Sequence, residues 1–161
     1  MVVIDSSVLI PLLRIGKLSL LQKIFGKVII TQEIYREINA GTLGLNEFEE
    51  ACNKWIIISE EKFENLEKVA KLENVEQADA SVLLLAQSKK EILISNDYSL
   101  ILSAKSKGVE CWWLTTVILK CLKKDIIKKK EAKKILFDLI KSGMRLDNEV
   151  YAMILEEIDK M

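Results

Sequence analysis

The sequence predicts an α/β protein in which helices lie on both faces of a central parallel sheet of about five strands. Short runs rich in valine and isoleucine alternate along the chain with segments of helical pattern, as in proteins built from strand–helix–strand units. Glycine follows five of the helical segments, and glycine is favoured just past a helix end because it accepts positive φ. These glycines are Gly16, Gly26, Gly41, Gly108 and Gly143. The length of 161 residues suits one domain with a sizeable core.

Five short apolar runs are the expected strands. They are residues 2–4, 28–30, 56–58, 92–94 and 109–111. If Ser7 caps a helix after the first strand, Pro11 lies beyond the first helical position that suits proline, which predicts a kink or a late start. A further helix is expected at residues 98–107, before the last strand.

Capping residues and apolar pattern mark the other helices between the strands. Thr31 can cap a helix that runs to about Ala40, and Ser59 can cap one that runs to about Leu72. Residues 76–89 are apolar nearly all round after the first turn, which is typical of a buried helix.

Two amphipathic helices follow the predicted sheet in the last third of the chain. Their apolar residues recur at a spacing of three and four, which places them on one face of each helix. They are Ala132, Ile135, Leu136, Leu139 and Ile140 in the first helix, and Tyr151, Ile154, Leu155 and Ile158 in the second. We therefore expect a C-terminal helical hairpin at residues 123–161, packed on a main domain at residues 1–122 or on a partner.

The composition excludes several kinds of catalysis, because the chain contains no histidine. It can therefore form no Ser-His-Asp or Cys-His nucleophile, no histidine general base and no histidine-ligated zinc site. The three cysteines are far apart and in no C-x-x-C pair, which argues against a disulfide framework or a structural zinc site. An enzyme of this composition must use carboxylates, lysines, hydroxyls or a bound metal.

Carboxylates follow the predicted strands at the edge where ligands bind in open parallel sheets. Asp5 follows the first strand directly, and Asp97 ends the Ser-Asn-Asp sequence after the fourth. The helix after the second strand carries Glu37, and the helix at 76–89 carries Asp79 in its first turn. Because clustered carboxylates repel one another unless a cation holds them, an oxygen-only cluster of this kind suits Mg²⁺ or Mn²⁺.

Four stretches of the sequence together resemble the PIN domain, the ribonuclease fold of VapC-type toxins and of ribosomal-RNA processing endonucleases. They are V-V-I-D-S-S-V-L-I, T-Q-E-I-Y-R-E-I, V-E-Q-A-D-A-S-V-L-L-L-A and I-L-I-S-N-D-Y-S-L, in family order over roughly residues 1–115. The ending K-I-L-F-D-L-I-K-S-G-M-R-L-D-N-E-V-Y is similar to the helical tail of a VapC-like subgroup. The resemblance implies a PIN-like three-layer α/β/α fold with a C-terminal helical hairpin.

The resemblance also implies roles for individual residues. The four acids of the family fall on Asp5, Glu37, Asp79 and Asp97. The two aspartates that follow strands would be the main metal ligands, and the other two acids would complete the cluster directly or through metal-bound water. The product expected for the family carries a 5′-phosphate and a 3′-hydroxyl.

Two accessory positions belong to the same comparison. Ser7 takes a small polar position that often hydrogen-bonds near the metal in this family. Many relatives carry two acids where this chain has Asn96 and then Asp97, so Asn96 would weaken a second metal site.

Each of the four acids also has an ordinary structural interpretation. The two aspartates that follow strands could cap the helices after them. Asp79 could be a favourable charge in the first turn of its helix, a role for which Glu76 competes. Glu37 could be a solvated helix residue, and Glu33 shares its helix face, so these two glutamates could exchange roles.

Residues 120–134 hold eight lysines and two acids, so this segment carries +6 and the rest of the chain carries −6. A lysine run of this kind is usually a solvated helix face. It could also guide an RNA backbone by counterion release, and Lys123, Lys124 and Lys128 are the candidates for that contact. The net charge of zero argues against non-specific affinity for nucleic acid through overall charge.

These observations lead to the hypothesis of a metal-dependent endoribonuclease that hydrolyses RNA phosphodiester bonds with Mg²⁺ or Mn²⁺. The expected partners are an RNA substrate, an antitoxin protein and a second copy of the chain in a homodimer. Two alternatives stay open: a catalytically weak or inactive PIN-fold module that binds RNA or protein, and an rRNA-processing nuclease. No apolar run approaches the ~20 residues of a membrane span, and no signal peptide is recognisable, so a cytoplasmic location without membrane contact is expected.

Overall fold

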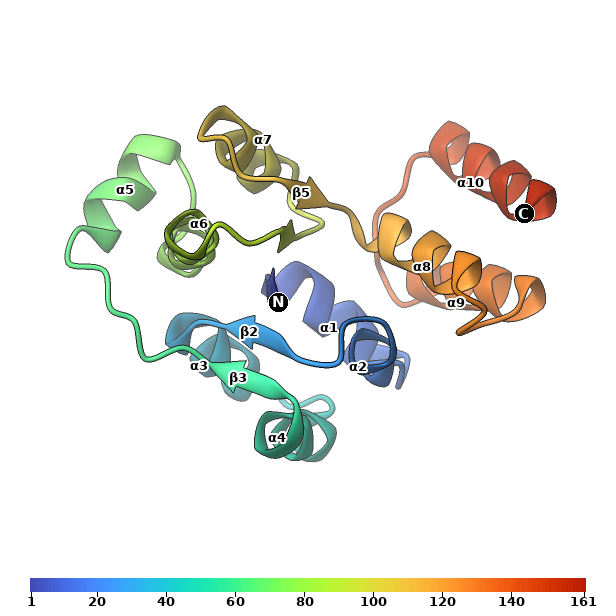
Figure 1. The fold of residues 1–161 in the computed structure, drawn as a ribbon, viewed down its shortest axis with the longest axis horizontal. Helices are drawn as coiled ribbons and strands as arrows, with labels where there is room; N and C mark the ends of the chain where they lie inside the picture. The colour runs from blue at the N-terminus through green and yellow to red at the C-terminus, as the bar shows by residue number, and fades with distance from the viewer.

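The computed structural model describes residues 1–161 and contains one five-stranded sheet with ten helices around it (Figure 1). The strands are β1 (Val2–Ile4), β2 (Val28–Ile30), β3 (Ile56–Ile58), β4 (Leu93–Ile94) and β5 (Cys111–Trp112). Every neighbouring pair is parallel, in the order β3-β2-β1-β4-β5. The prediction of an α/β protein with a parallel sheet of about five strands is therefore confirmed.

Ten helices connect and follow the strands. They are α1 (Ser6–Arg14), α2 (Ser19–Phe25), α3 (Gln32–Ala40), α4 (Leu45–Lys54), α5 (Leu66–Glu73), α6 (Gln77–Lys89), α7 (Tyr98–Ser106), α8 (Leu114–Lys123), α9 (Lys129–Lys141) and α10 (Asn148–Lys160). Thr31 caps α3 as predicted, since its hydroxyl accepts a hydrogen bond from the Ile34 amide at 3.1 Å. The helices α4 and α8 had no clear signal in the sequence.

Several predicted boundaries were wrong, each for a local reason. The Val109 amide donates to the Ala104 carbonyl oxygen at 2.9 Å and so closes the end of α7, which moves β5 to Cys111–Trp112. Ser59 does not begin a helix: its amide donates to the Ile30 carbonyl oxygen at 2.9 Å and extends the pairing of β3 with β2, and its hydroxyl accepts from the Glu61 amide at 3.2 Å in a turn that no helix follows directly. The next helix, α5, begins only at Leu66.

The first helix begins neither late nor after a Ser7 cap. It begins at Ser6, and the side chain of Asp5 caps it by accepting a hydrogen bond from the Ser7 amide. Pro11 lies inside the helix, which continues to Arg14.

One hydrophobic core of 40 buried residues joins the sheet and the helices. All three strands of the β2-β1-β4 centre are buried, and α6 is buried on most sides, as its apolar sequence predicted. The same cluster includes residues of the two C-terminal helices, among them Ile135, Leu139 and Ile158. The last part of the chain is thus continuous with the core of the sheet.

The C-terminal helices α9 and α10 form the predicted amphipathic pair, and they lie with α8 beyond β5 (Figure 1). Lys133 Nζ and Asp159 Oδ1 join them across the pair at 2.6 Å. Their outer faces leave Phe137 and Met153 more than half exposed. None of the ten helices combines the length and the apolar character that crossing a membrane requires.

The strand order creates a topological switch point between β1 and β4. From β1 the chain builds outward through β2 to β3, then crosses to β4 on the other side of β1 and continues to β5. Ile4 pairs with Ile94, and the Asp5 amide donates to the Ile94 carbonyl oxygen at 3.0 Å. Ligands of open α/β sheets bind outside the carboxyl ends of the strands at such a point. The residues after β1 and β4 therefore border the expected binding crevice.

Candidate active site

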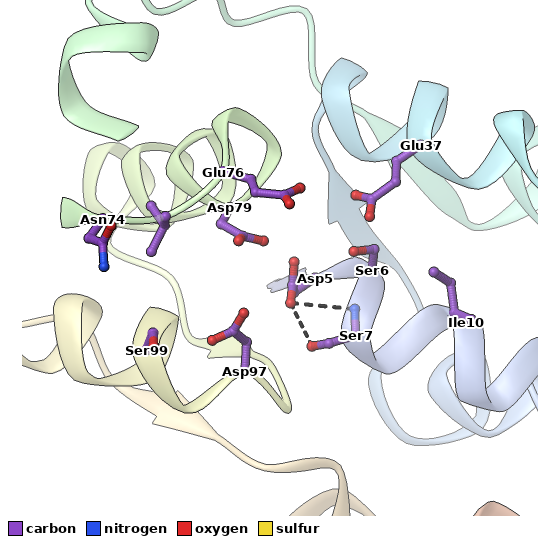
Figure 2. A pocket seen from close by; sticks show the side chains of 11 residues that line it. Asp5, Ser6, Ser7, Ile10, Glu37, Asn74, Glu76, Asp79, Asp97 and Ser99 are labelled. Carbon is purple, nitrogen blue, oxygen red and sulfur yellow. Dashed lines mark hydrogen bonds between the residues drawn. The ribbon is translucent and has the colours of Figure 1, made fainter. Parts of the chain in front are cut away.

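An open pocket of about 630 Å³ lies at this switch point, and all four predicted acids line it. Asp5 lies at the end of β1 and Asp97 after β4, while Glu37 comes from α3 and Asp79 from the first turn of α6. Glu76, just before α6, is a fifth carboxylate, and Figure 2 shows the five turned toward a shared space. No lysine or arginine lines the pocket. The fold thus brings carboxylates from separate parts of the chain together in one pocket.

Asp5 is almost fully buried, and its two carboxylate oxygens have different surroundings. Oδ2 accepts hydrogen bonds from Ser7 Oγ at 2.5 Å, Ser95 Oγ at 3.0 Å and the Ser7 amide at 3.4 Å. Oδ1 is buried and has no hydrogen-bond partner in the protein. Burial raises the pKa of Asp5 in spite of these hydrogen bonds, because the charged form loses its solvation.

Asp97 combines helix capping with a place in the pocket. Its Oδ1 accepts a hydrogen bond from the Leu100 amide at 3.1 Å, which caps α7. The Asp97 amide donates to Ser95 Oγ at 3.0 Å, and Ser95 in turn donates to Asp5. The capping interpretation is therefore correct for both aspartates. Capping does not prevent these aspartates from lining the pocket, because each uses only one carboxylate oxygen as the cap. The capping bond also fixes each aspartate at the start of a helix.

Asp79 is half-buried and Glu37 is more exposed, and the pKa of each is raised. Burial is the largest cause for Asp79, and the charges of the neighbouring aspartates add to it, so that its pKa rises to about 7. Burial is also the largest cause for Glu37, where a hydrogen bond from Ser6 opposes the rise and nearby carboxylates add to it. The pocket therefore lacks the positive charge that would stabilise its carboxylates in their ionised form.

Three further polar residues complete the site. Ser95 is fully buried, and its position two residues before Asp97 mirrors that of Ser7 two residues after Asp5. Ser6 is buried beside Glu37. Glu76, which the sequence offered as an alternative to Asp79 at the start of the same helix, lines the pocket together with it. The paired spacing of the serines was visible in the sequence, but only the register of β1 against β4 brings them together.

Asn96 and Glu33 do not line the pocket. Of the two glutamates on one face of α3, only Glu37 lines it. The Asn96 side chain instead bonds to backbone groups of α1 and α8. Its Nδ2 donates to the Ser7 carbonyl oxygen at 3.2 Å, and its Oδ1 accepts from the Leu114 amide at 3.2 Å.

The lysines predicted to contact RNA lie away from the acidic pocket. Lys123 and Lys128 border a separate hollow of about 580 Å³ where α8 meets α9, and Lys124 is exposed beside them. Figure 1 places this junction on the opposite side of the molecule from α5. Contact of these lysines with RNA stays a prediction.

The donor set of the pocket fits a hard divalent cation. All its charged groups are carboxylates, and the unpartnered Oδ1 of Asp5 is a buried acceptor that a cation would satisfy. As the side chains stand, no three of them are close enough together to form a complete metal-binding group. Holding an ion would therefore need side-chain rotation of the more exposed acids, whereas Asp5 is already fixed.

Comparison with known proteins supports the class that the fold and the site define, a nuclease-type α/β protein. A family model described as a PIN domain matches residues 1–160, so the chain belongs to the PIN domain family. Among solved structures, the chain is similar to PAE2754 from Pyrobaculum aerophilum, with 17% identity and a TM-score of 0.54. The match covers 73% of this chain and 92% of that one, and at this identity it supports the fold alone. Comparison with curated proteins finds no match.

Proposed function

We propose that this protein is a metal-dependent endoribonuclease that hydrolyses RNA phosphodiester bonds at the acidic pocket. One observation carries the proposal: five carboxylates line a pocket without a cationic side chain, and the most buried of them has an oxygen with no partner. Such an arrangement is electrostatically unfavourable unless a cation binds there. Membership of the PIN domain family supports hydrolysis of nucleic acid as the reaction.

In this proposal Asp5 and Asp97 hold Mg²⁺ or Mn²⁺, and Asp79 and Glu37 complete the cluster. A bound divalent ion would polarise the phosphodiester and lower the pKa of water. The contribution of the chain is to fix its ligands in advance. Ser7 and Ser95 hold Oδ2 of Asp5, so Oδ1 is the oxygen left for the ion. Asp79 is half-buried and Glu37 is exposed, so both can bind the ion directly or accept hydrogen bonds from water around it.

The test is cleavage of structured RNA by purified protein with Mg²⁺ or Mn²⁺, and then with a chelator. We expect cleavage that the chelator abolishes, with 5′-phosphate and 3′-hydroxyl ends. The Asp5→Asn variant should lose both cleavage and Mn²⁺ binding. Binding of Mn²⁺ by the native protein without cleavage of any RNA would favour the second interpretation, a PIN-fold module that binds RNA or protein. Unchanged cleavage by Asp5→Asn would show that the acidic pocket is not the site of cleavage.

The biological role that we propose is that of the toxin in a toxin–antitoxin pair, located in the cytoplasm. The similarity of the sequence to VapC-like proteins with a helical tail supports this role. The exposed apolar side chains Phe137, Val150 and Met153 on α9 and α10 offer a surface for an antitoxin or for a second copy of the chain. Arrest of growth on expression, relieved by the product of a small adjacent reading frame, would support the toxin role. Viable cells with altered ribosomal RNA ends would instead favour an rRNA-processing nuclease.

A further inference from the structure

The Asn96 side chain lies where four parts of the chain meet, next to the serine and aspartate of the acidic pocket. Asn96 follows β4, and its amide group reaches α1 through the Ser7 carbonyl and α8 through the Leu114 amide, both at 3.2 Å. Its Nδ2 also contacts Met144 Sδ, in the connection between α9 and α10, at 3.6 Å. One side chain therefore links the start of α1, the end of β4, the start of α8 and the C-terminal helices.

Pro11 explains why the Ser7 carbonyl is free to accept this bond. In an α-helix the amide at position i donates to the carbonyl at i−4, so residue 11 would be the donor to Ser7. Proline has no amide hydrogen, and the Ser7 carbonyl would otherwise have no partner in the helix. The Asn96 amide supplies the missing donor from another part of the chain. Pro11 thus leaves the Ser7 carbonyl without a donor in the helix, and Asn96 supplies one.

The position requires a donor and an acceptor on the same side chain. Nδ2 donates to Ser7 and Oδ1 accepts from Leu114, a combination that only an amide of this length provides. An ionised aspartate would keep the contact with Leu114 but would face the Ser7 carbonyl with a second acceptor.

The junction is connected to the catalytic aspartates through short hydrogen bonds. The Asn96 backbone amide donates to Ser7 Oγ at 2.8 Å, and Ser7 Oγ donates to Asp5 Oδ2 at 2.5 Å. Asp97 is the next residue along the chain. Any displacement of Asn96 relative to α1 would therefore move Asp5 and Asp97 relative to each other.

We propose that Asn96 is a positioning residue, which through its bond to the proline-freed Ser7 carbonyl sets the separation of Asp5 and Asp97. The proposal rests on the proposed function, in which these two aspartates hold the cation. It differs from the interpretation in which Asn96 merely replaces an acid of a second metal site, because it predicts that an acid at this position is harmful.

The test is a set of four proteins: the native chain, Asn96→Asp, Pro11→Ala and the double variant. Mn²⁺ affinity is measured by calorimetry, and kcat and KM are measured on RNA. Asn96→Asp should weaken Mn²⁺ binding by about 10-fold, within the range for groups that orient metal ligands, and should lower kcat more than it raises KM. Pro11→Ala alone should weaken Mn²⁺ binding less than Asn96→Asp does, because the restored amide competes with Asn96 for the Ser7 carbonyl but leaves the Asn96 side chain in place. The double variant should bind Mn²⁺ no better than Asn96→Asp, because the amide that Pro11→Ala restores satisfies the Ser7 carbonyl within α1 but does not rejoin α1 to the residues after β4.

A matched control is Asn53→Asp, which adds the same charge on the exposed side of α4 and should leave Mn²⁺ binding unchanged. Equal or tighter Mn²⁺ binding by Asn96→Asp would overturn the proposal in favour of a metal-ligand position. Return of Mn²⁺ binding in the double variant would show that the unsatisfied Ser7 carbonyl, and not the link between α1 and the residues after β4, is the cause of the loss. A native chain that binds no Mn²⁺ would refute the proposed function and the positioning role with it, whereas loss of the positioning role alone leaves native binding intact.

Discussion

The acidic pocket and the lysine-rich segment at residues 120–134 carry opposite charge but are built in different ways. The acids converge from four elements on one pocket, and the pKa values of three of them are raised. The lysines lie on the surface, and Lys128, Lys133 and Lys134 pair with nearby acids that are exposed or partly exposed. No cationic side chain lines the pocket, whereas three of the eight lysines of the segment have an acidic partner. This difference indicates that the pocket favours the binding of a cation, whereas the lysines would bind an anionic partner only weakly.

The strongest test of this contrast compares two glutamates one turn apart on α3. Glu37→Gln should lower Mn²⁺ affinity or kcat by about 10- to 100-fold, because it removes a carboxylate from the pocket lining. Glu33→Gln removes the same charge from the same helix face but not from the pocket, and should change either quantity by less than about twofold. Equal effects of the two variants would mean that overall charge, and not the pocket, determines binding.

The second test uses the raised pKa values of the pocket, with Asp79 at about 7 as the clearest case. A carboxyl group whose pKa is higher in the folded state binds more protons there than in the unfolded chain. Ionisation of this group therefore lowers the free energy of unfolding as pH rises from the usual carboxyl range near 4 to about 7. We expect the Tm of the metal-free protein to fall over that interval.

Asp79→Asn should flatten this dependence, and Mg²⁺ at pH 8 should raise the Tm of the native chain by binding only the folded state. Thermal unfolding followed by circular dichroism, with and without chelator, measures both effects. A Tm that rises steadily from pH 4 to pH 7 would contradict the assignment of the raised pKa.

Sequence reasoning located the acids of the pocket but not the residues that orient them. Asp5 and Asp97 were predictable because each directly follows a strand, and the edge of a parallel sheet gathers such residues. The role of Asn96 was not, because it depends on a carbonyl freed by Pro11 and on the place where α8 begins. These hydrogen bonds join residues 89 and 18 positions apart in the chain, and no local pattern encodes them.

Local pattern also failed where tertiary pairing took precedence over it. Ser59 has the residue type and position of a helix cap, yet its amide continues the β3–β2 ladder. Pro11 predicted a disturbed helix, yet α1 runs through it because its first turn is held by Asp5 and its free carbonyl has a partner. In both places, contacts between distant parts of the chain decided the outcome.

The third test concerns the lysines directly. Replacing Lys123, Lys124 and Lys128 by glutamine should raise KM for RNA a few-fold at low salt and leave kcat unchanged, if they contact the RNA backbone. Each lost contact should reduce the salt slope of binding by about 0.7 for a single strand. The control is the triple variant of Lys62, Lys68 and Lys89, which removes equal charge from other exposed positions. The same slope in both triple variants would show that the segment is only a solvated helix face.

The smallest expected effect is on the ion pair between Lys128 and Asp125. Lys128 Nζ lies 3.3 Å from Asp125 Oδ1, and both side chains are about four-fifths exposed. Exposed pairs of this kind contribute about 0.2–1 kcal/mol, so breaking it should lower the free energy of unfolding by no more than about 1 kcal/mol. Asp125 has a φ of 57°, a left-handed conformation that asparagine tolerates, so Asp125→Asn is the appropriate partner variant.

A double-mutant cycle of Lys128→Ala with Asp125→Asn, followed by urea unfolding, measures this coupling. A weak coupling means that the pair opens readily, so that the Lys128 ammonium is free to exchange its acid for a phosphate. A coupling well above about 1 kcal/mol would mean that the ammonium is committed to the fold. In that case the lysine-rich segment would resemble the pocket in having its charges fixed, and Lys128 would leave the set of RNA-contact candidates.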